Sequence, residues 1–96
     1  MSTTAEIIAI LAHEKQRLAQ RYHITSMALF GSYARGDQGP ESDVDIVIEV
    51  DPSIGLDFVT LAQDIESLLQ HKVDLVSRRA IQPRHWTHIE PELIHV

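Results

Sequence analysis

The sequence predicts an α/β (α+β) protein in which a small mixed β-sheet is flanked by helices, and residues 1–96 are expected to form a single domain. Amphipathic stretches with helical spacing alternate with short apolar stretches of strand length. Two of these stretches, "VDIV" at 44–47 and "VDLV" at 73–76, echo each other on either side of a helical pattern. A chain of 96 residues with 44% apolar residues has the size and composition of one globular domain.

The first third of the chain is predicted to form a helix and then a strand. Residues 4–21 place apolar side chains on one stripe at helical spacing, and Thr3 with Glu6 has the spacing of a capping box. Residues 24–30 are short, apolar and followed by a glycine, which is typical of a strand. Residues 32–37 are expected to form a short helical turn, which the following glycines and proline end.

The rest of the chain is predicted to form a strand, a helix, a strand and a last helical turn. Residues 43–50 are an apolar run typical of a strand covered on both faces. Residues 56–70 form a second amphipathic helix, and 73–77 form a third short strand. The inward stripe of that helix is expected to consist of Leu56, Val59, Ala62, Ile65, Leu68 and Leu69. The last helical turn is expected over 83–89, because a proline opens it and another follows it.

Composition narrows the classes of function. The net charge of -6, from 14 acidic and 8 basic residues, speaks against a broad basic surface for nucleic acid. The chain has no cysteine, which fits a reducing compartment. The apolar run at 7–12 is too short to span a membrane and has no basic residue before it. We therefore expect a soluble cytoplasmic domain with no membrane partner.

Acidic side chains are expected to converge at one edge of the sheet. Asp43 and Asp45 lie two residues apart on a strand and so point to the same side. The helix between the second and third strands makes those strands parallel, which brings Asp74 close to Asp45. The short turn between the first two strands makes them antiparallel, so Gly31 and Ser32 reach the same edge. Topology alone therefore predicts a cluster of three carboxylates beside a Gly-Ser turn.

This cluster suits a divalent cation and a nucleotide. Three close carboxylates repel one another unless a cation is present, and their hard oxygens suit Mg²⁺ or Mn²⁺. Two such ions about 3.5–4 Å apart can stabilise attacking and leaving oxygens in nucleotidyl transfer. Asp45 is expected to bridge both ions, and Asp74 to help activate the acceptor hydroxyl. Gly31 and Ser32 are expected to hold triphosphate oxygens, and Arg35 to neutralise phosphate charge. The alternative for Arg35 is an exposed ion pair with a nearby acidic residue, Asp37 or Glu41.

The motif "GSYARG…SDVDIVIE…VDLV", with ten residues between Gly31-Ser32 and Asp43, resembles the minimal nucleotidyltransferase (MNT) branch of the DNA polymerase β-type nucleotidyltransferase superfamily. The resemblance covers nearly the whole chain and implies a polymerase β-like nucleotidyltransferase fold. It implies that Gly31 and Ser32 hold nucleotide phosphates. It also implies that Asp43 and Asp45 bind metal, with Asp74 as the third carboxylate.

The family resemblance also implies a partner and a reaction. MNT proteins of this kind pair with a HEPN-domain ribonuclease toxin, and they act as antitoxins by transferring AMP from ATP to a tyrosine of that toxin. A hetero-oligomer with such a toxin is expected, and the lack of an acceptor-binding domain favours a protein acceptor. Two alternatives stay open: a non-catalytic antitoxin that acts by docking, and a nucleotidyltransferase with an RNA or small-molecule acceptor. The preferred nucleotide and the number of AMP units added stay open as well.

Features of the C-terminal region have simpler interpretations. His85 and His88 have i, i+3 spacing, but no further ligand lies nearby in sequence to complete a zinc set, so we interpret them as ordinary surface residues. Trp86 either packs the last helix on the sheet or anchors a partner. A small basic cluster after the third strand consists of Arg78, Arg79 and Arg84. This cluster is either a solvated face or a contact for phosphates, RNA or an acidic partner.

Overall fold

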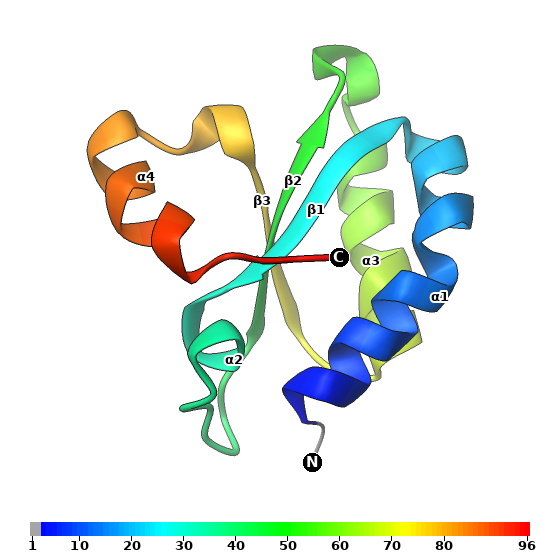
Figure 1. The fold of residues 1–96 in the computed structure, drawn as a ribbon. Coiled ribbons are helices and arrows are strands. Elements are labelled where there is room, and N and C mark those ends of the chain that lie inside the picture. Colours follow the sequence, from blue (N-terminus) through cyan, green and yellow to red (C-terminus); the bar gives the residue numbers. More distant parts are fainter. Residues whose placement is uncertain (1–2) are drawn as a thin grey trace.

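Two long helices cover one face of a single sheet, and a shorter C-terminal helix lies on the other side, as Figure 1 shows for the computed structural model, which describes residues 3–96. The strands in this range are β1 (Ile24–Phe30), β2 (Val44–Val50), β3 (Val73–Ser77) and β4 (Ile94–His95). The α-helices are α1 (Thr4–Tyr22), α2 (Gly31–Arg35), α3 (Asp57–Leu69) and α4 (Pro83–Ile89). Short 3-10 turns are η1 (Pro52–Ile54), η2 (Arg78–Ala80) and η3 (Glu90–Glu92).

The sheet is mixed, with strand order β3-β2-β1-β4. Strands β1 and β2 are antiparallel, β2 and β3 are parallel, and β4 pairs antiparallel with β1. The prediction of a small mixed sheet with flanking helices is therefore confirmed, together with both strand directions. Strand β4 was not predicted, because two paired residues are too few to give a periodic pattern.

The core lies between the sheet and the two long helices. On β2 the side chains of Val44, Ile46 and Ile48 are 0% exposed, whereas the residues between them alternate to the opposite face. Helix α1 contributes buried side chains at helical spacing, and its N-cap Thr3 accepts a hydrogen bond from the backbone N–H of Glu6. The opposite face of β2 is covered at Val47, which is buried, and carries the polar Asp45 and Glu49 on either side of it.

The predicted inward stripe of the second helix was partly wrong. The fully covered side chains of α3 are Leu61, Ile65 and Leu69, which follow one another at a spacing of four. Leu56, which precedes the helix as its N-cap, is 87% exposed, and Val59 is 55% exposed. The correction follows from helix geometry, because a stripe with a spacing of four turns Val59 away from the sheet.

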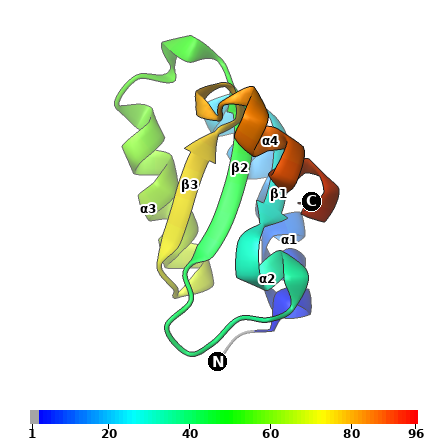
Figure 2. The same ribbon diagram turned by 90° about the vertical axis from the view of Figure 1, so that its left-hand side faces the viewer.

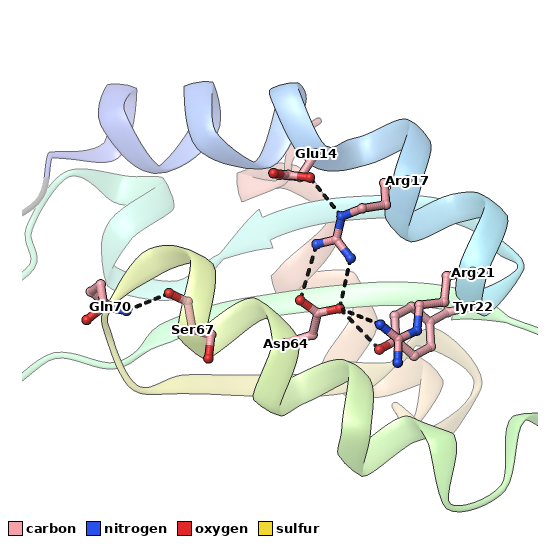
Figure 3. A network of polar contacts seen from close by, with 7 residues as sticks. All are labelled: Glu14, Arg17, Arg21, Tyr22, Asp64, Ser67 and Gln70. Carbon is pink, nitrogen blue, oxygen red and sulfur yellow. Dashed lines mark hydrogen bonds and ion pairs between the residues drawn. The ribbon is translucent and has the colours of Figure 1, made fainter.

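A charged network joins α1 to α3 outside this core (Figure 3). The Arg17 guanidinium donates hydrogen bonds to both carboxylate oxygens of Asp64, each at 3.2 Å, and to Glu14 at 2.9 Å. The Tyr22 hydroxyl donates to Asp64 at 3.1 Å, and Arg21 lies 3.8 Å from the same carboxylate. Asp64 of α3 thus links the two helices, because its carboxylate contacts two arginines and a tyrosine of α1.

Within residues 3–96, no helix is both long and apolar enough to cross a membrane.

Candidate active site

Two of the predicted aspartates are neighbours at the N-terminal edge of β2 and β3. Asp45 pairs with Asp74 in the parallel register, and with Phe30 in the antiparallel register of β1. Asp43 lies one residue before β2, and Gly31 directly follows Phe30 as the first residue of α2. Figure 2 shows α2 at the same end of the sheet where β2 and β3 begin. The topology therefore brings the predicted residues to one edge.

The backbone at Gly31 lies directly against the carboxylate of Asp45. Gly31 has φ +74°, a left-handed conformation that favours glycine. A Cβ atom at this position would lie 2.1 Å from Oδ2 of Asp45 and 3.0 Å from its Cγ. Both the conformation and the space therefore require glycine here, and contact of Gly31 with triphosphate oxygens stays a prediction.

Asp45 carries the perturbed carboxylate of the site. Burial, together with the nearby negative charges of Asp74 and Asp43, raises the pKa of Asp45 from 3.8 to about 6, and Arg35 opposes the shift. Within residues 3–96 none of the three aspartates forms an ion pair with a basic side chain. Negative charge thus accumulates at this edge with little positive charge from the protein to balance it.

Hard carboxylate oxygens without protein counter-charges fit a divalent cation such as Mg²⁺ in chemical character. In the described range 3–96, however, no three acidic, histidine or cysteine side chains are grouped closely enough to hold a metal ion. The aspartates therefore gather at one edge without forming a finished metal shell, and their role as metal ligands stays a prediction.

Arg35 is engaged by two carboxylates within the protein. Its Nε donates to Asp37 at 3.0 Å, which is the local ion pair considered as the alternative, and its Nη1 donates to Glu92 at 3.1 Å. Glu92 also accepts a hydrogen bond from the backbone N–H of Gly31 at 2.9 Å. Nucleotide contact by Arg35 stays a prediction.

Sequence reasoning missed Glu92 altogether. It lies 61 residues from Gly31 and 57 from Arg35, and only the folded C-terminal segment brings the three together. The sequence held no signal for it beyond an acidic residue beside the second proline of the C-terminal region. Ser32 is half-exposed at the start of α2, and its carbonyl accepts from the backbone N–H of Gly36 at 2.8 Å, which closes the turn.

An open hollow of about 450 Å³ adjoins Asp74 on the same face of the sheet as the aspartates. Asp74 and Val76 of β3 and Phe30 of β1 form the sheet side of the hollow. Residues of η2, α4 and the link between them form the other side, and these are Ala80, Ile81, Gln82, His85 and Ile89. The hollow is mostly apolar, with a carboxylate at its margin, and it opens next to the acidic edge.

Trp86 and Arg78 contact each other at the end of the sheet away from the aspartates. The Arg78 guanidinium carbon lies 3.8 Å from the centre of the Trp86 ring, and the ring N–H donates to Glu90 at 3.2 Å. Trp86 thus links α4 to η2 and η3 within the chain.

Comparison with known proteins defines the class of protein. The family model described as a nucleotidyltransferase domain matches residues 13–95, and the chain belongs to that family. Within it, the chain is a protein adenylyltransferase of the minimal nucleotidyltransferase type. It is 38% identical over 84 residues to Protein adenylyltransferase MntA of Thermococcus cleftensis, covering 85% of this chain and 84% of that one. It is 43% identical over 101 residues to MJ1379 of Methanocaldococcus jannaschii, described as a candidate protein adenylyltransferase, with both chains fully covered.

Solved structures agree with this assignment. A candidate minimal nucleotidyltransferase superposes with a TM-score of 0.75 at 29% identity, over 94% of this chain and 95% of the other. A chain of a toxin–antitoxin structure with AMP-PNP superposes with a TM-score of 0.71 at 27% identity, over 86% of this chain and 69% of the other. The fold and family predicted from the Gly-Ser and Asp-Val-Asp motifs are therefore confirmed.

Proposed function

We propose that this chain is the antitoxin of a toxin–antitoxin pair and transfers AMP from ATP to a tyrosine hydroxyl of a cognate HEPN ribonuclease toxin, with Mg²⁺ as the metal. The proposal rests on one observation: Asp45 and Asp74 are paired on neighbouring strands, and the carboxylate of Asp45 lies against the backbone of Gly31. The chain that carries this arrangement belongs to the protein adenylyltransferases. The similarity to a toxin–antitoxin structure with an ATP analogue supports both the substrate and the kind of partner.

In this proposal the three aspartates and the Gly-Ser turn have different roles in the transfer of AMP. The tyrosine oxygen attacks the α-phosphorus, a new O–P bond forms, and the bond from that phosphorus to pyrophosphate breaks. Asp74 accepts the hydroxyl proton, and Gly31 with Ser32 holds the phosphates that leave as pyrophosphate. Asp43 and Asp45 would hold the Mg²⁺, which would neutralise the charge that develops on the phosphate oxygens.

The hollow beside Asp74 is the place we assign to the acceptor ring. Pyrophosphate leaves on the Gly31 side of Asp45, so an in-line acceptor approaches from the opposite side, where Asp74 lies on the neighbouring strand. Phe30, Val76 and Ile89 give this hollow an apolar lining that suits an aromatic side chain. A phenol seated there presents its hydroxyl near the Asp74 carboxylate.

The decisive test is transfer to the partner encoded beside this chain. The purified pair is incubated with ATP and Mg²⁺, and the partner is weighed by intact mass spectrometry. A gain of one or more AMP units on a tyrosine, abolished in the Asp43→Ala plus Asp45→Ala variant while its fold is retained, is the expected result.

Two other results would reject the proposal. Neutralisation that survives the double substitution, without any AMP adduct, would identify an antitoxin that acts by docking alone. Label from radioactive ATP that appears on RNA or on a small molecule, and not on the partner, would identify a different acceptor.

A further inference from the structure

Glu92 of η3 is a carboxylate with two partners in the proposed nucleotide-binding turn. Its Oε1 accepts from the backbone N–H of Gly31 at 2.9 Å, and its Oε2 accepts from Nη1 of Arg35 at 3.1 Å. The two partners are the first and last residues of α2. One side chain therefore holds both ends of the five-residue helix that begins with the Gly-Ser motif.

The C-terminal segment fixes where this carboxylate lies. Two residues beyond Glu92, Ile94 of β4 pairs with Leu29 of β1, and the N–H of Val96 donates to the carbonyl of Met27 at 3.0 Å. The side chain of Glu92 is only 22% exposed, whereas that of Arg35 is 49% exposed. The strand pairing thus presents Glu92 to α2 as a partly buried group on a hydrogen-bonded backbone.

The negative charge of Glu92 is unfavourable at this place if its hydrogen bonds have only a structural role. Glu92 adds a fourth acidic group near an edge that already carries three aspartates, and it lies close enough to Asp45 to influence that carboxyl. An uncharged acceptor would satisfy the N–H of Gly31 without this repulsion. The charge of Glu92 has a specific partner in Arg35, so the group is suited to orient that guanidinium and the turn that bears it.

We propose that Glu92 is a positioning residue for nucleotide binding: it holds Gly31 and Arg35 in the geometry in which the turn receives the triphosphate. The inference rests on the proposed function, because it requires that ATP binds at this turn. It adds a C-terminal residue to the site, and it makes the β4 pairing a condition for nucleotide affinity.

Binding of ATP with Mg²⁺ to the purified chain tests this proposal without the toxin. Titration calorimetry on Glu92→Ala is expected to give a Kd about tenfold weaker than that of the wild type, because two charge-assisted contacts on the turn are lost. Glu92→Gln keeps an oxygen acceptor for the Gly31 N–H but loses the ion pair, so an intermediate Kd is expected. Glu90→Ala, in the same turn but bonded to Trp86, is the matched control and should keep the wild-type Kd.

A double-mutant cycle separates positioning from a merely structural role. If Glu92 acts through Arg35, the Kd of the Glu92→Ala plus Arg35→Ala variant should be weakened by clearly less than the product of the two single effects. Melting temperatures measured alongside should differ little between Glu92→Gln and Glu90→Ala, so that stability does not explain the change in Kd.

Three results would overturn the inference. An unchanged Kd in Glu92→Ala would make the contact structural only. A tighter Kd would mean that Glu92 competes with phosphate for the turn. Failure of the wild-type chain itself to bind ATP with Mg²⁺ would reject the proposed function as well, whereas either of the first two results in a wild type that binds ATP rejects this inference alone.

Discussion

Asp64 and Asp45 are both partly buried aspartates, but their surroundings affect them in opposite directions. Hydrogen bonding from Arg17 lowers the pKa of Asp64, and the Tyr22 hydroxyl adds to this effect (Figure 3). Burial and, after it, the charge of the adjacent Asp74 raise the pKa of Asp45 to about 6. Asp64 forms ion pairs with Arg17 and Arg21, whereas Asp45 forms none with the basic side chains of residues 3–96.

The difference separates the charges that stabilise the fold from those that serve the site. Between α1 and α3, acid and base are matched, so the network stabilises the folded state without help from outside. At the edge formed by β2 and β3, carboxylates lie together and, within residues 3–96, form no ion pair with a basic side chain. Substitutions in the network between α1 and α3 should therefore change the free energy of unfolding, whereas substitutions at the edge of β2 and β3 should change AMP transfer.

The largest effect is expected for Asp45→Asn. This change removes the central carboxylate of the edge but keeps its size, so AMP transfer should fall by about 10²–10⁴-fold, equivalent to several kcal/mol of lost charge stabilisation. The melting temperature should stay the same or rise, because the change relieves repulsion between like charges. Initial transfer rates and thermal melts check both parts, and a variant that keeps transfer would contradict the role assigned to Asp45.

The next largest effect on AMP transfer is expected for Gly31→Ala, with Gly36→Ala as its comparison. In Gly31→Ala the new Cβ would lie 2.1 Å from Oδ2 of Asp45, so that carboxylate has to move and transfer should fall at least about tenfold. Gly36 has a similar φ of +79° but nothing within 4 Å of the added Cβ. Gly36→Ala should therefore cost only the backbone strain, about 1 kcal/mol, and keep transfer.

Transfer assays and urea denaturation of both variants separate strain from displacement of Asp45. Equal losses of transfer in the two variants would mean that backbone strain, and not the contact with Asp45, limits the site.

The acidic edge could be predicted from the sequence because it depends only on residue spacing within a strand and on the connections between consecutive elements. A helix between two short strands implies parallel pairing, and that pairing alone places Asp74 beside Asp45. The Gly-Ser turn follows a strand antiparallel to β2, so its place at the same edge was equally predictable.

What could not be predicted depends on contacts between distant segments. Strand β4 is two residues long, and its pairing with β1 gives no periodic pattern in the sequence. Glu92 reaches the site only through that pairing. The exposed Leu56 and Val59 were misassigned because the apolar residues of this stretch fit more than one helical stripe, and only the packed stripe Leu61, Ile65 and Leu69 faces the sheet.

The complementary variant in the helical region is Asp64→Ala. Its carboxylate is only 17% exposed and accepts from Arg17 and Tyr22, so the loss should lower the free energy of unfolding by about 1–3 kcal/mol. AMP transfer should stay near the wild-type rate, because the network lies on the helix-covered side of the sheet. Urea denaturation measures the first quantity, and a fall in transfer without unfolding would show that the two charged regions are coupled.

The smallest effect is expected in the pH dependence of folding stability, to which Asp45 and Asp64 contribute with opposite signs. The raised pKa of Asp45 means that the folded state binds an extra proton between pH 3.8 and about 6, so its contribution to stability is full below pH 3.8 and is lost as the pH rises through 6. The lowered pKa of Asp64 has the opposite sign, because its contribution is present above pH 3.8 and is lost as the pH falls through the lowered value.

Carboxyl-carbon NMR titration of the metal-free chain tests the Asp45 part of this comparison. The Asp45 resonance should titrate near pH 6, and Asp74→Asn should move its midpoint toward 3.8, because the substitution removes the like charge that is the largest contributor after burial. Mg²⁺ with ATP should lower the same midpoint in the wild type, since a bound cation favours the ionised carboxylate. A midpoint already near 3.8 without metal would mean that the protein supplies its own counter-charge at the edge, and the distinction between Asp45 and Asp64 would then fail.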